Sequence, residues 1–393
     1  MSVMYDIVIR GGRLIDPSQG INGTRDIAVS QGKIANVSRH IDDAEAGKII
    51  DARGKIVAPG LIDLHTHVAY GVVELGLAPD DGGVRSGVTT LCDCGSTGIA
   101  NFQAFKKDVI SQAATDVFCF LHVVPNGLAV IPENWSLLDI DPAAMLGMIE
   151  QNRDIIKGVK IRATGAMVKS LGLEGMKIAK KTASEAGVPL MIHLGANPEE
   201  LVSEEEMDRF TSDMLNLLDE GDILTHVFTW KKGGVIKPDG RVLPGFRDAI
   251  ERGVCLDVAN ARSHYSADIA RIALNQGIVA HTMSTDITFA SFRTLVFSLL
   301  VTMSKFLAIG FDLEQLIKMT TVNPSQVLTD GKDRGSLRIG LPADVSILEL
   351  KEGDFLFHDG IEGKTFKGDK LIEPVLTLKE GKEITAESRY VAA

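Results

Sequence analysis

One stretch of the chain is the most informative about the fold: Ile56-Val57-Ala58-Pro59-Gly60-Leu61-Ile62-Asp63-Leu64-His65-Thr66-His67. Its first part is an apolar run typical of a buried strand, and His65 and His67 stand at the end of that run. Residues i and i+2 of a strand point to the same face, so the two imidazoles are aimed at one point in space. Two neutral imidazoles converging in this way suit a divalent transition metal. The alternative, two surface histidines at a strand end, has to be weighed against the rest of the chain.

Short apolar runs recur along the chain, and each is followed by a helix-like stretch such as residues 173–186 or 203–218. Spacings of about 25–40 residues between runs are typical of an α/β fold, the (β/α)8 TIM barrel. A doubly wound open sheet is the alternative. Such a sheet typically has a glycine-rich phosphate-binding turn after its first strand, where this chain has histidines. The runs lie at residues 60–64, 89–92, 117–123, 158–161, 189–192, 223–226, 254–258 and 278–283.

The two ends of the chain follow a different pattern. Residues 5–57 alternate like short strands separated by glycine turns, and residues 343–348 and 375–378 resume this pattern near the C-terminus. Strands from both ends can pair into one small unit beside a barrel. We therefore expect a β-sandwich domain built from residues 1–57 and 336–393, and a metal-dependent barrel over residues 58–335.

Bulk properties exclude several classes of protein. The 393 residues are 45% hydrophobic and 24% charged, a globular mixture, and the net charge of −11 argues against binding to nucleic-acid phosphates. The first residues lack the pattern of a signal peptide, and the most apolar segment, 294–304, is too short to cross a bilayer. The four cysteines have no zinc-knuckle spacing and are expected to be reduced core residues. We expect a cytoplasmic protein with a small-molecule substrate and no membrane or nucleic-acid partner, and a homo-oligomer remains open.

Polar residues gather at the C-terminal ends of the expected barrel strands, where barrels of this type carry their chemistry. Each such residue alone has a structural explanation. Six of them at the same end of one barrel indicate a shared site. They are His65 and His67 after the first strand, Lys160 at the fourth, His193 at the fifth, His226 at the sixth and Asp286 after the eighth.

Lys160 needs an argument of its own, because an ammonium group is only a donor and cannot ligate a metal. Burial beside cations lowers the pKa of a lysine and makes the neutral amine available. A neutral amine can add carbon dioxide to give a carbamate, whose two oxygens and negative charge can bridge two metal ions. The alternative is an ammonium that pairs with Asp286 or another acid.

Four segments then form a recognisable set: residues 9–16, 57–67, 321–324 and 335–344. With them the chain resembles the amidohydrolase superfamily, in the binuclear class that includes dihydroorotase, hydantoinase and related deacylases. Residues 87–90, 95–98 and 158–162 are similar to a subgroup labelled dihydroorotase by similarity, in which some members hydrolyse N-acetyl amino acids or acetyl-mandelate.

The resemblance implies a metal-dependent hydrolase of a small-molecule amide or ester, similar to a deacetylase. A hydroxide that bridges two divalent ions would attack a metal-polarised carbonyl, with Asp286 as general base and then general acid. Zinc is the default ion for mixed nitrogen and oxygen ligands, although manganese or cobalt would fit too. The implied ligands are His65, His67 and Asp286 for the first ion, His193 and His226 for the second, and carboxylated Lys160 for both.

Four further residues are candidates for substrate contacts. Arg162 lies two residues beyond Lys160 on the same strand face and could meet a carboxylate or form a structural salt bridge. His264 departs from the pattern of the acetyl hydrolases, because it comes later after Asp257 and no glycine follows it. This departure puts an acetyl substrate in question. Tyr70 and Ser96 lie on loops at strand ends and complete the set.

Other functions stay open within this resemblance. A cyclic amidase of the dihydroorotase or hydantoinase type is the main alternative. A non-catalytic scaffold relative would tend to lack metal ligands, all of which are present here. A deaminase of the superfamily usually binds one metal and has no lysine at the fourth strand.

Overall fold

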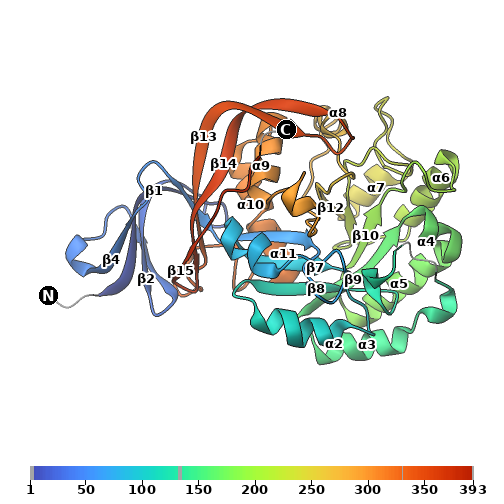
Figure 1. The fold of residues 1–393 in the computed structure, drawn as a ribbon, viewed down its shortest axis with the longest axis horizontal. Coiled ribbons are helices and arrows are strands. Elements are labelled where there is room, and N and C mark those ends of the chain that lie inside the picture. The colour runs from blue at the N-terminus through green and yellow to red at the C-terminus, as the bar shows by residue number, and fades with distance from the viewer. Residues whose placement is uncertain (1–3, 132–134, 330, 392–393) are drawn as a thin grey trace.

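A curled sheet of seven parallel strands forms the centre of the protein, whose computed structural model describes residues 4–131, 135–329 and 331–391 (Figure 1). The strands lie side by side in the order of the chain and make a TIM-like half-barrel. All side chains of the first strand are buried, as expected for a parallel sheet that is covered on both faces. The strands are β6 (Leu61–Thr66), β7 (Val88–Cys94), β8 (Asp116–His122), β9 (Ile156–Ala163), β10 (Leu190–Leu194), β11 (Ile223–Thr225) and β12 (Cys255–Asp257).

The expected eighth strand is an irregular extended segment between β12 and β6. It makes one parallel bridge to each neighbour, Thr282 to Asp257 and Ile287 to Thr66. Asp286 adopts a left-handed φ of 52°, which interrupts the extended conformation that a regular strand requires. The α/β barrel class is confirmed, and the break at the eighth position falls at a candidate site residue.

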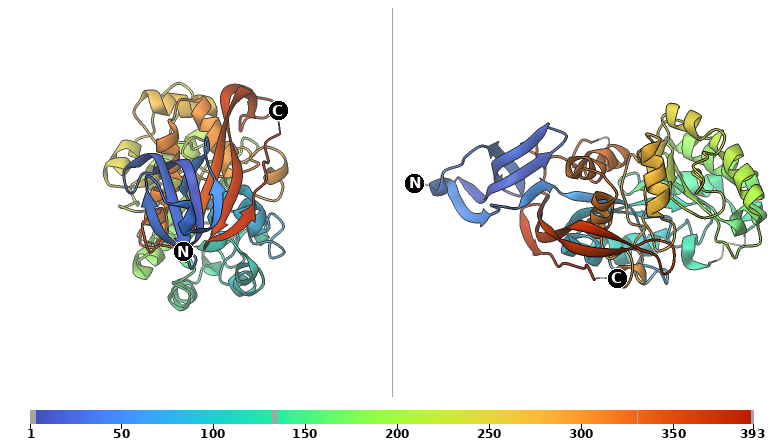
Figure 2. Two further views of the ribbon diagram at one scale, coloured as in Figure 1. Left: turned by 90° about the vertical axis from the view of Figure 1, so that its left-hand side faces the viewer. Right: turned by 90° about the horizontal axis from the view of Figure 1, so that it is seen from above.

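Helices cover the outer face of the half-barrel (Figures 1 and 2). Their starts follow ordinary capping rules: the Ser203 hydroxyl accepts from the Glu206 amide, and acidic side chains occupy the first turn of α6. The helices are α1 (Pro79–Gly82), α2 (Phe102–Ala104), α3 (Pro142–Gln151), α4 (Gly165–Ser170), α5 (Gly172–Ala186), α6 (Glu204–Leu215), α7 (Phe246–Glu251), α8 (Ala267–Asn275), α9 (Leu299–Ala308), α10 (Leu313–Met319) and α11 (Val322–Thr329).

Strands from both ends of the chain form one mixed sheet beside the barrel, which confirms that the two termini build a joint unit (Figure 2). We expected a sandwich, and the strands instead belong to a single hydrogen-bonded sheet that curls over its apolar face. Backbone bonds from Ile34 to Leu341 and from Ala343 to Gly32 link distant parts of the curl. The strands are β1 (Tyr5–Asp16), β2 (Ile21–Ser30), β3 (Lys33–Ser38), β4 (Ala46–Asp51), β5 (Ile56–Pro59), β13 (Val345–His358), β14 (Thr365–Lys379) and β15 (Lys382–Thr385).

Gly60 connects β5 of the mixed sheet to β6 of the barrel. A Cβ at this position would lie 2.2 Å from the Thr89 hydroxyl oxygen, so the close approach of the chains requires glycine. This junction is compatible with the domain boundaries near residues 57 and 336, which stay our proposal. Within the described ranges, no helix is long and apolar enough to span a membrane.

Candidate metal centre

The polar residues expected at the strand ends lie together at the C-terminal end of the half-barrel. His65 belongs to β6, Lys160 to β9 and His193 to β10, while His226 directly follows β11. Their side chains are almost fully removed from solvent. Asp286 lies in the irregular eighth segment. The fold therefore brings together residues that are up to about 220 positions apart in sequence, from His65 to Asp286.

The first cluster surrounds the carboxylate of Asp286. Its Oδ1 lies 2.9 Å from His67 Nε2 and 3.3 Å from His65 Nε2, and its Oδ2 lies 3.9 Å from His226 Nε2. One ligand atom from each of His65, His226 and Asp286 falls within 4.8 Å of the other two. One cation fits between atoms at such separations.

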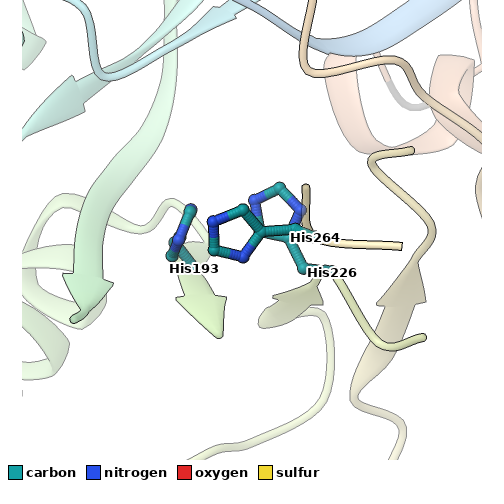
Figure 3. Close-up of side chains that lie close together, drawn as sticks. All are labelled: His193, His226 and His264. Atoms are coloured by element: carbon teal, nitrogen blue, oxygen red, sulfur yellow. The ribbon is translucent and has the colours of Figure 1, made fainter. Parts of the chain in front are cut away.

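The second cluster consists of His193, His226 and His264, whose ligand atoms also lie within 4.8 Å of one another (Figure 3). The ring centres of His193 and His226 are 4.2 Å apart, and those of His193 and His264 are 4.4 Å apart. His226 is a member of both clusters. The structure thus places His264 beside His193 and His226. The sequence predicts a substrate contact for His264.

Outer hydrogen bonds fix the orientation of these rings. The Nδ1 of His65 lies 2.9 Å from the Thr225 hydroxyl, which donates to Asp257 at 2.7 Å. The Nδ1 of His67 lies 2.8 Å from the Ser96 hydroxyl. Such partners hold the other ring nitrogen, Nε2, toward the centre of the site. The sequence predicts a substrate contact for Ser96, and in the structure the Ser96 hydroxyl contacts His67.

His226 is held by the backbone. Its Nδ1 lies 2.9 Å from the carbonyl oxygen of Ala259, which can only accept, so Nδ1 carries the proton and Nε2 carries a lone pair. His226 has a left-handed φ of 64°, and Ala259 has one of 40°. Non-glycine residues in this conformation are uncommon and often lie at functional sites.

Burial and charge set the ionisation of the site. Burial, followed by the charge of Lys160, lowers the pKa of His65 well below the usual value, and burial also lowers the pKa of His193 and His226. Burial alone would raise the pKa of Asp286, but the histidines around it outweigh this and hold its pKa well below the usual range. Neutral imidazoles therefore face an ionised carboxylate.

The residues present fit a bound cation. Among the described residues, Nε2 of His193 and Nε2 of His226 are buried without any hydrogen-bond partner, and Oδ1 of Asp286 faces the Nε2 atoms of His65 and His67. Buried polar atoms are rarely left unsatisfied, and here they are electron-pair donors that belong to the two clusters. A divalent cation in each cluster would satisfy them.

Lys160 is fully buried, and its Nζ lies 3.0 Å from Nε2 of His65 and 3.6 Å from the sulfur of Met191. Burial lowers its pKa. Within the described ranges no carboxylate lies in ion-pair distance of this nitrogen, so the pairing with Asp286 that we considered as an alternative is not observed. Gly95 packs directly on the lysine, because a Cβ there would lie 2.7 Å from Lys160 Cγ.

The remaining predicted substrate residues lie in different surroundings. Arg162 is half-buried on β9, and its charge helps to lower the pKa of His193 after burial and the neighbouring histidines. Tyr70 is 57% exposed and lines a surface hollow with Pro79 and Asp108. Their roles toward a substrate stay predictions.

Two further residues of the site, Asp257 and Lys231, were not predicted as functional residues from the sequence. Asp257 ends β12 and accepts hydrogen bonds from three buried hydroxyls, of Thr225, Thr282 and Ser284. An acid at the end of an apolar strand was a usable signal for it. Lys231 lies in a loop after β11, and no local pattern marks it.

Residues 56–384 match the sequence model of the amidohydrolase family. The chain belongs to the amidohydrolase family. A deacetylase of Agrobacterium fabrum is 31% identical over 364 residues, which cover 92% of this chain and 86% of that protein.

Two solved structures resemble the whole amidohydrolase chain. An adenine deaminase superimposes with a TM-score of 0.87 at 28% identity, covering 97% of this chain and 99% of its own. A dihydroorotase superimposes with a TM-score of 0.85 at 28% identity, covering 98% and 100%. The family and these relatives confirm the prediction of a hydrolase in this superfamily.

Proposed function

We propose that this amidohydrolase is a metal-dependent deacetylase that removes an acyl group from a small-molecule amide or ester. The observation that carries the proposal is the set of buried electron-pair donors on His193, His226 and Asp286, of which the two histidine Nε2 atoms have no hydrogen-bond partner among the described residues. The likeness to a deacetylase over most of both chains supports the acyl substrate.

The proposed ligands follow the two clusters. His65, His67 and Asp286 would hold one divalent ion, His193 and His226 would hold the other, and Lys160 as a carbamate would supply further oxygen ligands. When bound, two such ions lower the pKa of a shared water and polarise the scissile carbonyl. Two dications carry four positive charges, so a carbamate adds anionic oxygen ligands that the described histidines cannot supply. Zinc suits this mixture of nitrogen and oxygen donors.

Asp286 is the proton carrier of the proposed reaction. Its carboxylate is ionised, and Oδ1 and Oδ2 face different histidines. Its carboxylate would help to hold the first ion, and we assign to it the uptake of a proton and its delivery to the leaving group. Thr225 and Asp257 keep His65 in a fixed orientation while this happens.

Two alternative functions are each supported by similarity to a solved structure. The dihydroorotase likeness favours a cyclic amide, and the adenine deaminase likeness favours a purine. A panel of N-acetyl amino acids, acetylated hydroxy acids, hydantoins, dihydroorotate and adenine separates these possibilities. We expect turnover of an acylated compound that stops when a chelator removes the metal. Turnover confined to dihydroorotate, a hydantoin or adenine would reject the deacetylase assignment.

A further inference from the structure

Lys231 is a second buried lysine beside the histidines. It is 4% exposed and lies in the loop after β11. Its Nζ lies 2.8 Å from Nε2 of His264 and 2.9 Å from the Ser263 hydroxyl, and it also contacts Oδ1 of Asn197. An ammonium group has three N–H donors, so each donor of Lys231 has one neutral acceptor.

The contact with Lys231 fixes the protonation of His264. The ammonium can only donate, so Nε2 of His264 must accept. The Nδ1 of His264 lies 3.2 Å from the carbonyl oxygen of Leu194, so Nδ1 carries the proton. Burial, together with the charge of Lys231, holds the pKa of His264 well below its usual value, which agrees with a neutral ring. Both ring nitrogens are therefore occupied by groups of the protein.

His226 shows what His264 would be without this contact. Both rings direct Nδ1 to a backbone carbonyl, at 2.9 Å for His226 and 3.2 Å for His264. In the described structure the Nε2 of His226 has no partner, whereas the Nε2 of His264 accepts from Lys231. Their ring centres are only 4.6 Å apart. Three histidines are thus close enough to share one ion, but only His193 and His226 offer it an electron pair.

We propose that Lys231 keeps His264 from becoming a metal ligand and thereby leaves one binding position of the second ion open for the substrate. Structural metal sites are closed by protein ligands, whereas catalytic sites keep a position free. A third imidazole at the second ion would occupy the position that a catalytic site keeps free. Lys231 is a positioning residue in this account, because it acts through His264.

The unpaired charge of Lys231 supports its role in positioning His264. No carboxylate of the described residues lies within ion-pair distance of its Nζ, and its acceptors are all neutral. A buried charge without a counter-charge is costly, and a smaller neutral side chain would fill the space at lower cost. The loops after β10, β11 and β12 meet at this nitrogen through Asn197, Lys231 and Ser263.

Metal retention tests the proposal directly. The zinc-loaded wild-type protein and its variants are exposed to a chelator, and zinc release and residual zinc are measured. In Lys231→Met, His264 becomes a ligand, so release of one equivalent slows by at least about tenfold, the scale on which altered ligand surroundings change metal affinity. In the cobalt-loaded variant, the visible spectrum changes because a nitrogen ligand is added.

Two further variants complete the test. The double variant Lys231→Met/His264→Ala returns to the wild-type release rate, and His264→Ala alone keeps the wild-type zinc content. Zinc loss in His264→Ala, or unchanged release in a folded Lys231→Met, overturns the proposal. Should Lys231→Met fail to fold, His264→Ala decides alone. The proposal rests on the metal site proposed above: a wild-type protein that binds no zinc rejects both, whereas zinc loss in His264→Ala rejects this inference only.

Discussion

Lys160 and Lys231 are both buried beside the same histidines, and each contacts a histidine Nε2, at 3.0 Å and 2.8 Å. Their other contacts differ. Lys231 has an acceptor for each of its donors, whereas Lys160 has, among the described residues, one further polar contact, to the sulfur of Met191 at 3.6 Å. A thioether is a weak acceptor, so the ammonium form of Lys160 is poorly satisfied.

The comparison shows how surroundings assign two chemistries to one side chain. Burial lowers the pKa of Lys231 to about 8, so near pH 7 its ammonium form prevails and donates to the neighbouring ring. Burial also lowers the pKa of Lys160, and because its ammonium form is poorly satisfied, Lys160 is better suited to the neutral amine, which can carry a carboxyl group. Substitutions of these lysines and of the residues around them test this division.

Lys160→Ala should remove the bridge and with it both metal ions and activity, a loss of metal affinity well above ~100-fold. Metal content by mass spectrometry and activity are measured together. Short carboxylic acids or bicarbonate should restore part of both. Lys157→Ala is the matched control, because Lys157 lies on the same strand, 5.0 Å from the Phe118 ring centre and outside the site. Two ions retained in Lys160→Ala would discard the bridge.

Asp286→Asn should keep an oxygen ligand but lose the group that carries the proton. We expect kcat to fall by about 10²–10⁴-fold at saturating metal, the usual contribution of general acid–base catalysis. KM should change much less. Steady-state kinetics at increasing zinc concentration distinguish lost chemistry from lost metal. A variant with wild-type kcat would remove Asp286 from the proton path.

Lys305 in α9 extends the comparison to a third buried lysine. Its Nζ donates to the Leu295 carbonyl at 3.1 Å, and burial lowers its pKa to about 7. In the unfolded chain its pKa is about 10.4, so between these values the unfolded chain binds more protons. The free energy of unfolding therefore falls as the pH is lowered from about 10 to 7.

Lys305→Met removes the group that takes up a proton when the chain unfolds. We expect the variant to exceed the wild type in stability by up to about 4 kcal/mol at pH 7, with a smaller difference at pH 9. Urea unfolding at the two pH values measures this difference. A stability difference that is the same at both pH values would show that Lys305 is charged in the folded protein.

Ser96→Ala removes the outer partner of His67 and leaves the ring itself in place. Loss of such a partner weakens metal binding by about 10–100-fold, and we expect the lower end for one hydroxyl. Ser86→Ala is the control, because its buried hydroxyl bonds the backbone of Asp81 outside the site. Competition with a chromogenic chelator measures the affinity. Equal affinities in the two variants would assign Ser96 to the substrate.

The sequence was sufficient for the barrel class and for placing six residues at one end of it, because both follow from strand periodicity. The irregular eighth segment could not be predicted, since the positive φ of Asp286 depends on tertiary contacts. The Lys231–His264 contact joins two loops that are 33 residues apart, and no local pattern encodes such a pair. The exposure of Tyr70 likewise depends on how its loop packs.

Reconstitution of the metal-free protein tests whether the site needs two metal ions. Zinc is added in steps to the chelator-treated chain, and activity on an acylated substrate is followed against equivalents bound. The two-ion site predicts that activity continues to rise up to the second equivalent per chain. Full activity at one equivalent, or in the absence of metal, would contradict it.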